Sequence, residues 1–331
     1  LVMKNNYKLL DVKNLRTAFN VEGKDVTVVN DISFDLSPGE IVGLVGESGC
    51  GKSVTALSLM GLIPDPPGKI LGGEIFLEGK DLLKFSESDM EKVRGKEIGM
   101  IFQEPMTSLN PVLTIGKQIT EILELHQDMS KEEAINEAIE LLKLVGLTDP
   151  ELRINDYPHK LSGGQRQRIM IAIALSCKPK ILIADEPTTA LDVTIQAQIL
   201  ELIQKLSKEL GTSVILITHN LGILARYAHK INVMYAGHLI ESGTTDEIFY
   251  NPKHPYTAGL LNSVPRLDLD PNIELPTIKG EVPNLAEFNE GCIFKTRCPN
   301  PTNDCKDGKS EMGLIEVEPG HLVDKCCVNC K

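Results

Sequence analysis

The eight residues from Gly46 to Ser53, GESGCGKS, constrain the fold of this chain more than any other stretch. They follow a short apolar run, Ile41 to Val45, that is typical of a buried strand, and a stretch of helical composition begins at Ser53. The spacing fits G-x-x-x-x-G-K-[ST], in which backbone N–H groups close around phosphate oxygens and only glycine permits the turn. The sequence therefore predicts a strand, a phosphate-binding loop and a helix, in that order.

Each part of this loop has an expected task in holding a nucleotide. The Lys52 ammonium group would reach the β- and γ-phosphates of ATP, and the Ser53 hydroxyl would ligate Mg²⁺. The alternative is a glycine-rich turn that binds nothing, and the flanking strand and helix argue against it. We assign no redox role to Cys50, because the backbone matters more than the side chain at its position. The loop residues expected to contact phosphates before Lys52 are Gly46, Glu47, Ser48, Gly49, Cys50 and Gly51.

Two adjacent carboxylates end a second apolar run, KILIADEP, from Lys180 to Pro187. The four apolar residues before Asp185 are typical of a parallel strand buried on both faces, and ligands of such sheets bind at the carboxyl ends of the strands. Asp185 would then hold Mg²⁺, and Glu186 would orient or polarise water for attack on the γ-phosphate. A solvated acidic turn is the alternative, and the apolar run in front of the pair argues against it.

A third apolar run, SVILITH, ends at His219. Most lone histidines are surface residues or satisfied core residues. A histidine at the end of a strand in a nucleotide-binding sheet is nevertheless well placed to contact a phosphate. Position alone leaves both interpretations of His219 open.

Small residues begin a predicted helix in the segment PHKLSGGQRQRIMIAIAL, from Pro158 to Leu175. Ser162 and the two glycines after it precede apolar residues at helical spacing, so the N–H groups of a helix N-terminus would form a second anion site. The stretch LSGGQ, Leu161 to Gln165, resembles the signature motif of the ATP-binding cassette (ABC) family. The other motifs of that family occur in the family's order: the phosphate-binding loop, Gln103, LSGGQ, the carboxylates at 185 and 186, ALD at 190–192 and His219.

The resemblance implies that the chain works as half of a dimer. Two cassettes of this family pair head to tail, and each ATP lies between the phosphate-binding loop of one subunit and the signature helix of the other. No motif position departs from that of a working ATPase, so active hydrolysis is expected. By the resemblance, Ser162, Gly163 and Gly164 contact the ATP held by the partner, and the ATP bound here is handled by Lys52, Ser53, Gln103, Asp185, Glu186 and His219.

Some roles follow from the resemblance alone. Gln103 would join Ser53 and Asp185 at Mg²⁺, and it would act with Glu186 and His219 in catalysis. Phe19 occupies roughly the place where cassettes stack an aromatic ring on adenine, with a plain core phenylalanine as the alternative. Gln165 and Asp192 complete the expected nucleotide-binding set.

Three further stretches resemble the cassettes of bacterial dipeptide, oligopeptide and nickel importers: QEPMTSLNPVLTIGKQI from Gln103, TTALDVTIQAQIL, and HPYTAGLLNSVPR from His254. In that group, the residues after Gln103 form a groove for a coupling helix of the membrane subunit. The implied partners are a second ABC ATPase subunit, homologous or identical, two transmembrane permease subunits and, indirectly, an extracellular substrate-binding protein. Peptides are the expected cargo. A nickel or other small-solute importer is the alternative, and a soluble ABC ATPase without a role in transport is a further one.

Composition and charge argue against several other classes of protein. Hydrophobic residues make up 42% of the chain and charged residues 24%, which is ordinary for a globular protein and unlike a disordered or fibrous one. The net charge of -12, without a basic run, argues against nucleic acid as a partner. Neither a signal peptide nor a membrane-spanning apolar stretch is recognisable. We therefore expect a peripheral protein at the cytoplasmic face of a bacterial membrane, held there by its partners.

Other cassette proteins are organised differently from this chain. Translation and resistance factors usually carry two cassettes, and this chain has one. Cassettes that act on DNA have a long heptad insertion before the signature motif, whereas residues 104–160 hold only a modest helical segment. Exporters often fuse the membrane domain to the cassette, so its absence favours an importer subunit.

The last part of the chain carries six of its eight cysteines. Prolines break this region into short segments, and a small module of this kind commonly needs a cross-link to stay folded. Because a reducing cytoplasm disfavours disulfides, a bound metal is the physical candidate for that cross-link. The cysteine spacing alone does not identify the metal. It matches neither the closely spaced cysteine pairs of zinc sites nor the C-x₂-C-x₂-C pattern of bacterial ferredoxins. Some of the importer cassettes that this chain resembles hold a [4Fe–4S] cluster on four C-terminal cysteines, matched here by Cys292, Cys298, Cys305 and Cys326. Structural zinc and free thiols are the alternatives, and Cys327 and Cys330 leave the fourth ligand open.

The expected fold class is α/β. By the resemblance it is a P-loop NTPase nucleotide-binding domain of the ABC type, with a RecA-like core, an antiparallel β subdomain and a helical subdomain. Residues 1–255 would form this domain, with the helical subdomain at about 106–165. Residues 256–331 would form a small C-terminal module that carries the metal-cluster cysteines.

Overall fold

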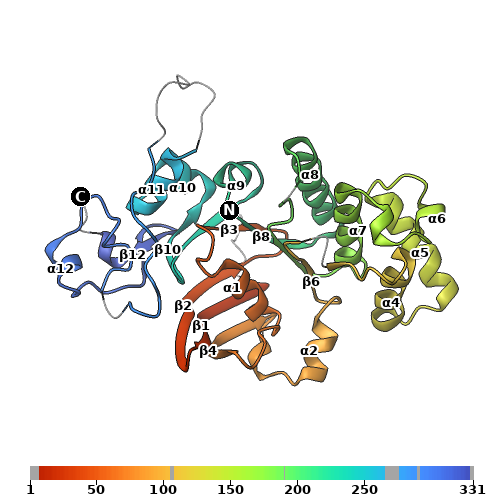
Figure 1. Ribbon diagram of the computed structural model, residues 1–331, viewed down its shortest axis with the longest axis horizontal. Helices are drawn as coiled ribbons and strands as arrows, with labels where there is room; N and C mark the ends of the chain where they lie inside the picture. The colour runs from red at the N-terminus through yellow and green to blue at the C-terminus, as the bar shows by residue number, and fades with distance from the viewer. Residues whose placement is uncertain (1–6, 105–107, 190, 265–275, 289–290, 329–331) are drawn as a thin grey trace. The chain divides into compact units, whose positions relative to one another are not determined.

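The computed structural model describes residues 7–104, 108–189, 191–264, 276–288 and 291–328. The chain divides into two compact units, the first made of residues 1–36, 41–83 and 218–331 and the second of residues 37–40 and 84–217. Both units combine strands with helices (Figure 1). Within the described ranges, no helix has both the length and the apolar content needed to cross a membrane.

The first unit contains an antiparallel sheet and part of a larger sheet. The antiparallel sheet has the order β2 (Lys24–Leu36), β1 (Leu10–Val21), β4 (Gly68–Leu77) and β5 (Lys80–Asp81). Five further strands run in the order β11 (Leu314–Glu318), β12 (His321–Asp324), β10 (His238–Thr244), β9 (Lys230–Tyr235) and β3 (Ile41–Val45). Of the pairs in this series, β3 and β9 are parallel and the others are antiparallel.

Short helices join the strands of the first unit. Helix α1 follows β3 and packs against β1 and β2, which lie beside it in Figure 1. The helices are α1 (Lys52–Leu59), the 3₁₀ turn η1 (Leu82–Lys84), α9 (Leu221–Tyr227), α10 (Thr245–Tyr250), α11 (Pro255–Asn262), α12 (Asn303–Lys306) and the 3₁₀ turn η3 (Lys325–Cys327).

The second unit contains three parallel strands and most of the long helices. The strands run in the order β8 (Ser213–Thr218), β7 (Ile181–Asp185) and β6 (Ile98–Ile101). Helix α7 contacts α4, α5, α8 and β6. The helices are α2 (Glu87–Val93), α4 (Ile115–Gln127), α5 (Lys131–Leu144), α6 (Pro150–Arg153), the 3₁₀ turn η2 (Pro158–Lys160), α7 (Gly163–Leu175) and α8 (Val193–Leu210).

The three strands predicted from apolar runs are confirmed as β3, β7 and β8. Every residue of these strands is buried. A continuous apolar run is the pattern of a parallel strand covered on both faces, because neither face alternates with polar side chains. Each strand therefore delivers the residue that follows it to the edge of a closely packed sheet.

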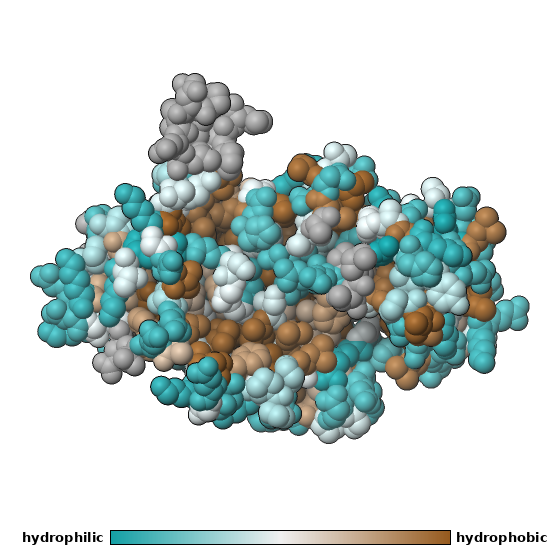
Figure 2. All heavy atoms as spheres, in the orientation of Figure 1, coloured by the Kyte–Doolittle hydropathy of each residue, from teal (hydrophilic) through white to brown (hydrophobic). Residues whose placement is uncertain are grey.

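The helices of the second unit begin at clear capping residues. The Ser130 hydroxyl accepts a hydrogen bond from the Glu133 N–H at the start of α5, and the Glu133 carboxylate accepts one from the Ser130 N–H. Such a capping box satisfies two of the N–H groups that a helix N-terminus leaves without a helical partner. Over α4 to α7, Figure 2 shows mostly polar side chains with single apolar ones among them. The exposed apolar residues of these helices include Leu125 and Leu152.

The C-terminal strands extend the sheet of the first unit, which the sequence did not predict. Glu241 and Ser242 of β10 pair with Val323 and Leu322 of β12. Strand β11 then pairs with the outer edge of β12. The residues after Cys305 are therefore attached to the strands that follow α9, through main-chain hydrogen bonds.

Candidate active site

The phosphate-binding loop joins β3 to α1, and two of its glycines are required by their surroundings. A Cβ atom on Gly46 would lie 2.1 Å from the carbonyl oxygen of Met234 in β9, which is far inside contact distance. Gly51 has a φ of 102°, and a Cβ atom there would lie 2.7 Å from the carbonyl oxygen of Val28. Only glycine fits both positions without displacing backbone. The predicted strand, loop and helix are thus confirmed in their order.

The Lys52 side chain is folded into this loop. Only 5% of the residue is exposed, and its Nζ donates hydrogen bonds to the carbonyl oxygens of Gly46 at 2.8 Å and Glu47 at 2.9 Å. The ammonium charge is therefore fixed inside the loop, where phosphate oxygens would meet it together with the backbone N–H groups. Ser53 is half-buried at the second position of α1. Burial raises the pKa of the Cys50 thiol, which favours its neutral form.

Residues from outside the loop hold Glu47, and the sequence did not predict them. The Glu47 N–H donates to the hydroxyl of Tyr256 in α11 at 3.0 Å. The Glu47 carboxylate accepts two hydrogen bonds from the guanidinium group of Arg297. No local signal predicts these contacts, because Arg297 lies 250 positions after Glu47.

In the second unit, Gln103 and Glu186 lie together. The Nε2 of Gln103 donates to Oε2 of Glu186 at 3.1 Å, and the Thr189 hydroxyl donates to the same oxygen at 3.0 Å. Glu186 directly follows β7, whose last residue, Asp185, is 4% exposed. The φ of Glu186 is 44°, in the left-handed region that residues other than glycine seldom adopt. Gln103 and Thr189 thus both bind Oε2 of this carboxylate, and Thr189 is a partner that the sequence did not predict.

The signature segment begins α7 with a capping box. The Ser162 hydroxyl accepts from the Gln165 N–H at 3.3 Å, and the side-chain Oε1 of Gln165 accepts from the Ser162 N–H at 3.0 Å. A Cβ atom on Gly164 would lie 3.2 Å from Ile195 of α8, so a side chain there would press on that helix. Asp192 caps α8 by accepting from the Ile195 N–H at 3.0 Å. The predicted start of the helix at the signature is confirmed.

The remaining predicted residues are placed as follows. His219 is exposed directly after β8 and precedes Asn220, whose side chain caps α9. Phe19 is half-buried on β1, opposite Gly68 of β4. The phosphate-binding loop, Phe19 and His219 belong to the first unit, whereas Gln103, Asp185, Glu186 and the signature segment belong to the second. Residue 190 of the ALD motif, residues 105–107 of the expected groove and Cys330 lie outside the described residues.

Comparison with known proteins identifies the family. The family model described as ABC transporter matches residues 29–189, and the model described as oligopeptide/dipeptide transporter, C-terminal region, matches residues 240–305. The oligopeptide transport ATP-binding protein OppD of Bacillus subtilis (strain 168) is 56% identical over 316 residues, which cover 96% of this chain and 88% of that protein. The chain belongs to the ABC transporter family.

A second relative and a solved structure agree with this assignment. The dipeptide transport ATP-binding protein DppD of Bacillus subtilis (strain 168) is 51% identical to this cassette, with 98% of this chain and 94% of that protein covered. A solved dimer of an ATP-binding cassette in a post-hydrolysis state, bound to ADP and Pi, is 28% identical with a TM-score of 0.64. It covers 71% of this cassette and 98% of its own chain. The predicted α/β cassette fold and the ATPase class are confirmed.

The four cysteines predicted to hold a metal cluster belong to the first unit of the cassette. The Sγ atoms of Cys292 and Cys326 are 3.2 Å apart. The pKa of Cys292 is raised, first by its hydrogen bond with Cys326 and then by burial. Burial raises the pKa of the Cys298 thiol, and the nearby Cys292 and Cys305 raise it further. None of the seven cysteines that the structure describes forms a disulfide.

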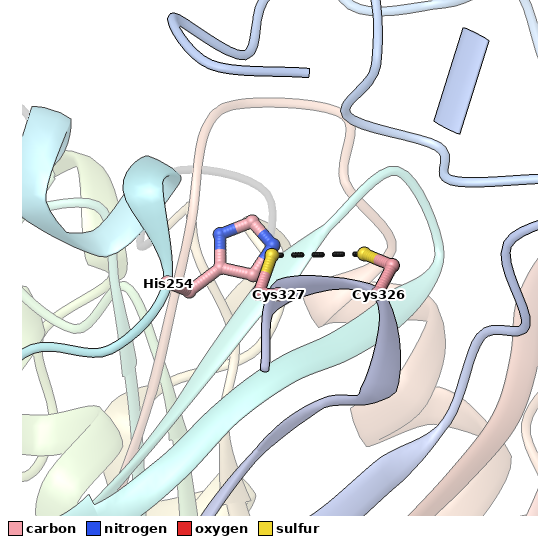
Figure 3. A group of neighbouring side chains, drawn as sticks. All are labelled: His254, Cys326 and Cys327. Atoms are coloured by element: carbon pink, nitrogen blue, oxygen red, sulfur yellow. Dashed lines mark hydrogen bonds between the residues drawn. The ribbon is translucent and has the colours of Figure 1, made fainter. Parts of the chain in front are cut away.

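A histidine that the sequence analysis did not assign to the cysteine region lies beside Cys326 and Cys327 (Figure 3). One ligand atom from each of His254, Cys326 and Cys327 lies within 4.8 Å of the others, and all three residues are buried. The Nδ1 of His254 accepts from the Tyr256 N–H at 3.0 Å, and its Nε2 has no hydrogen-bond partner among the residues that the structure describes. Burial lowers the pKa of His254 to about 3, so the ring is neutral. The cysteine spacing gave no sign of this neighbour.

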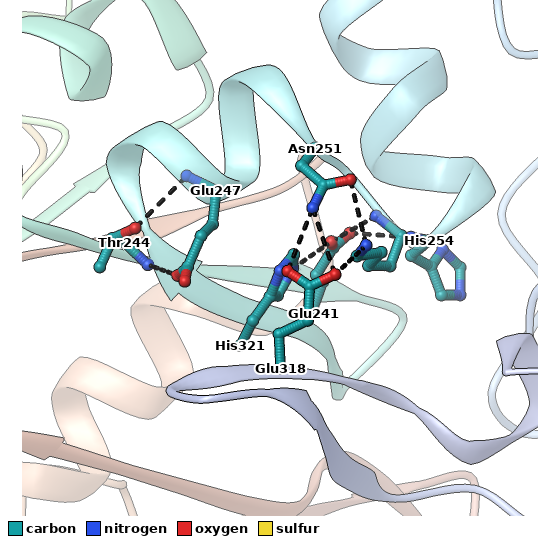
Figure 4. A network of polar contacts seen from close by, with 8 residues as sticks. Glu241, Thr244, Glu247, Asn251, His254, Glu318 and His321 are labelled. Atoms are coloured by element: carbon teal, nitrogen blue, oxygen red, sulfur yellow. Dashed lines mark hydrogen bonds and ion pairs between the residues drawn. The ribbon is translucent and has the colours of Figure 1, made fainter.

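A buried carboxylate ties the C-terminal strands to α11 (Figure 4). Glu241 of β10 is fully buried and accepts hydrogen bonds from the N–H groups of Lys253 at 2.6 Å and His254 at 3.0 Å. The Nε2 of His321 in β12 lies 2.8 Å from Oε1 of Glu241. On the exposed side of the same turn, Lys253 forms an ion pair with Glu318 of β11 at 2.6 Å. Glu241 of β10 therefore holds the backbone of His254 and the side chain of His321.

Proposed function

We propose that this cassette is the ATP-hydrolysing subunit of a bacterial peptide importer, in which the closing and opening of a cassette dimer drives the membrane subunits. ATP binding closes the dimer and hydrolysis reopens it. The peptide cargo is supported by the two relatives that are 56% and 51% identical and are named as oligopeptide and dipeptide transport proteins. The chain itself need not touch the cargo, because an external binding protein and the membrane subunits would select it.

The observation that carries the ATPase function is the orientation of Glu186. Its carboxylate accepts hydrogen bonds from Gln103 and Thr189 and stands at the carboxyl end of a fully buried strand. A carboxylate fixed at this edge of a sheet can accept a proton from an attacking water or align that water. Gln103 and His219 would assist at the γ-phosphate.

The nucleotide would be held mainly by the phosphate-binding loop. The N–H groups of residues 46–51 and the Lys52 ammonium group offer donors and a positive charge to the phosphates. Phe19 would stack on the adenine. Mg²⁺ would be held by Ser53, Gln103 and Asp185, and when bound it would neutralise charge on the phosphates.

A second cassette, identical or homologous, would complete each site. The partner's ATP would be met by the N-terminus of α7, where Ser162, Gly163, Gly164 and Gln165 present backbone N–H groups and a hydroxyl. Asp192 would lie at the same dimer surface. Two transmembrane permease subunits and, indirectly, an extracellular substrate-binding protein are the further partners, so the cassette would work at the cytoplasmic face of the membrane.

The domain division that we propose follows these tasks. Residues 1–255 form the nucleotide-binding domain, and the helical subdomain at about 106–165 carries the signature toward the partner. Residues 256–331 form the C-terminal module. Its proposed task is to hold a metal cluster that cross-links its short segments.

The cysteines of this module are the candidate ligands of a [4Fe–4S] cluster. Cys292, Cys305 and Cys326 are buried and Cys298 is half-buried. Packed thiols of this kind resist ionisation, and a bound metal would supply the positive charge that stabilises four thiolates. We propose Cys292, Cys298, Cys305 and Cys326 as ligands of a structural cluster.

Metal analysis of protein purified without oxygen tests this cluster. About four iron and four sulfide per chain, with a broad absorbance that disappears in Cys298→Ser, are expected. Stoichiometric zinc without colour would contradict the cluster. Comparing Cys326→Ser, Cys327→Ser and Cys330→Ser identifies the fourth ligand, and Cys177→Ser, in the second unit, is the control.

ATP hydrolysis by the complete importer complex tests the proposed ATPase. The Glu186→Gln variant should hydrolyse ATP about 10²-fold more slowly or worse, because it loses the carboxylate that receives the proton. Glu121→Gln, which removes an exposed carboxylate from α4, should hydrolyse ATP at the parent rate. A parent-like rate in Glu186→Gln would refute the assigned role.

A further inference from the structure

Glu47, the second residue of the phosphate-binding loop, is held at three points. Its N–H donates to the Tyr256 hydroxyl at 3.0 Å, and its carbonyl oxygen accepts from Lys52 Nζ at 2.9 Å. Its carboxylate pairs with Arg297, with distances of 2.8 Å from Nη1 to Oε2 and 3.1 Å from Nη2 to Oε1. Lys52 is therefore connected to Arg297 through a single residue.

The Arg297 guanidinium group is almost fully enclosed. Its side chain is 6% exposed and that of Glu47 is 28% exposed. The parallel pair of N–H···O bonds is the geometry in which a guanidinium group fixes both the position and the orientation of a carboxylate. Nη2 and Nε of Arg297 also donate to the carbonyl oxygens of Ile278 and Lys279, each at 3.2 Å. Burial by itself would lower the pKa of Arg297, but the bonds to Glu47 and Tyr235 raise it, so the group stays charged.

The turn that carries Arg297 is anchored in a buried aromatic cluster. Phe294 is 1% exposed, and its ring centroid lies 5.2 Å from that of Tyr235 and 5.6 Å from that of Tyr256. The N–H groups of Arg297 and Cys298 both donate to the Phe294 carbonyl oxygen, at 3.0 Å and 2.9 Å. The Tyr256 hydroxyl also accepts a hydrogen bond from the Glu47 N–H. The same aromatic cluster therefore supports the loop in two ways, through its backbone at Glu47 and through the Arg297 side chain.

We propose that Arg297 is a positioning residue for ATP binding: the C-terminal module uses it to hold Glu47, and thereby the first turn of the phosphate-binding loop and Lys52, in the conformation that receives phosphates. This inference rests on the proposed function of the loop and adds a task for the C-terminal module. Arg297 would act on the loop through Glu47, whose carboxylate it binds. Without the pair, the Glu47 side chain loses its bidentate partner, and the first turn is held at Glu47 by the Tyr256 hydroxyl, Lys52 and the Cys50 N–H. The loop then loses part of its preorganisation.

An ion pair that only stabilises the fold and a residue that positions the loop can be told apart by measuring Tm and nucleotide affinity. A pair that only stabilises the folded chain would lower Tm and leave the nucleotide affinity of the folded protein unchanged. A positioning residue changes the affinity of the folded protein, since the loop must be ordered before it binds phosphate. We expect Arg297→Gln to raise Kd and KM for ATP roughly tenfold and to change kcat at saturating ATP far less.

The experiment measures equilibrium binding of radiolabelled ATP and steady-state hydrolysis in the complete complex. Arg297→Gln removes the positive charge. Arg297→Lys keeps the charge but cannot form the bidentate pair of hydrogen bonds, and Glu47→Gln alters the more exposed partner. The double variant Arg297→Gln with Glu47→Gln should be no weaker than Arg297→Gln alone, because both changes break one interaction. Thr296→Ala, at an exposed position of the same turn, should bind ATP like the parent.

The outcomes separate this inference from the proposed function. If Arg297→Gln and Glu47→Gln, folded and with the parent's metal content, bind ATP with the parent Kd, the positioning role is wrong. Additive losses in the double variant would also overturn it. If Arg297→Gln fails to fold, Glu47→Gln and Arg297→Lys decide the question, and an unchanged Kd in both overturns it. An inactive parent complex that binds ATP would contradict the proposed ATPase and leave the binding test of Arg297 valid.

Discussion

Substituting His321 should release the C-terminal strands while leaving the second unit intact. His321 of β12 has no exposed surface, and its Nε2 lies 2.8 Å from a carboxylate oxygen of Glu241, which is equally buried. The variant His321→Leu keeps an apolar side chain in the space and removes the hydrogen bond. Of the three described partners of the Glu241 carboxylate, two then remain: the backbone N–H groups of Lys253 and His254.

The size of the effect follows from the burial of both groups. Removing one hydrogen-bond partner from a buried charged acceptor costs about 2 kcal/mol, and breaking a fully buried pair can cost about 3–5 kcal/mol. Because Glu241 keeps two other donors, the lower figure applies. A loss of about 2 kcal/mol corresponds to a roughly 30-fold change in an opening equilibrium.

Hydrogen exchange of the complete chain, read by mass spectrometry on fragments, measures this opening locally. Amides of β11 and β12 should exchange roughly 30-fold faster in His321→Leu, and those of α4 and α5 should not change. Glu318→Gln is the matched control, because it breaks an exposed ion pair between β11 and Lys253 and should leave exchange near the parent rate. Equal exchange in His321→Leu and the parent, or equal acceleration in Glu318→Gln, would refute the reasoning.

Three further variants test the nucleotide site. Gly46→Ala should abolish binding of radiolabelled ATP in equilibrium dialysis, because its Cβ atom would meet a carbonyl oxygen of β9 at 2.1 Å; parent-like binding would show that the loop can shift. Thr189→Ala should lower kcat severalfold without a matching rise in KM, since Glu186 loses a donor that orients it, and an unchanged kcat would remove Thr189 from this role. Ser162→Ala should destabilise the start of α7 by about 1 kcal/mol, seen as faster amide exchange there, and slow hydrolysis by the dimer; normal exchange and hydrolysis would contradict both effects.

Local sequence patterns predicted the elements that carry the site. The strands β3, β7 and β8 are continuous apolar runs, and the structure buries every residue of each. The helix that starts after Ser162 was predicted because a hydroxyl residue followed by glycines precedes apolar residues at helical spacing. The relatives also confirm the predicted function as the ATP-binding subunit of a peptide transporter.

Contacts between distant residues could not be predicted. Arg297 reaches Glu47 across 250 positions, and a lone arginine near a cysteine carries no local sign of such a partner. The same limit applies to His254, which lies beside Cys326 and Cys327 although the cysteine spacing implied no histidine. Strand β12 was missed because its four residues are too short for a periodic pattern, and its pairing with β10 is set by the fold.

Peptide uptake by the complete importer tests the central claim most directly. The cassette, its partner cassette and the two membrane subunits are placed in lipid vesicles with the binding protein and a radiolabelled oligopeptide on the outside and ATP inside. We predict uptake that requires ATP and is lost when Glu186→Gln replaces the parent, although that variant still binds ATP. ATP hydrolysis without uptake of any peptide, or uptake that continues with Glu186→Gln, would contradict the account.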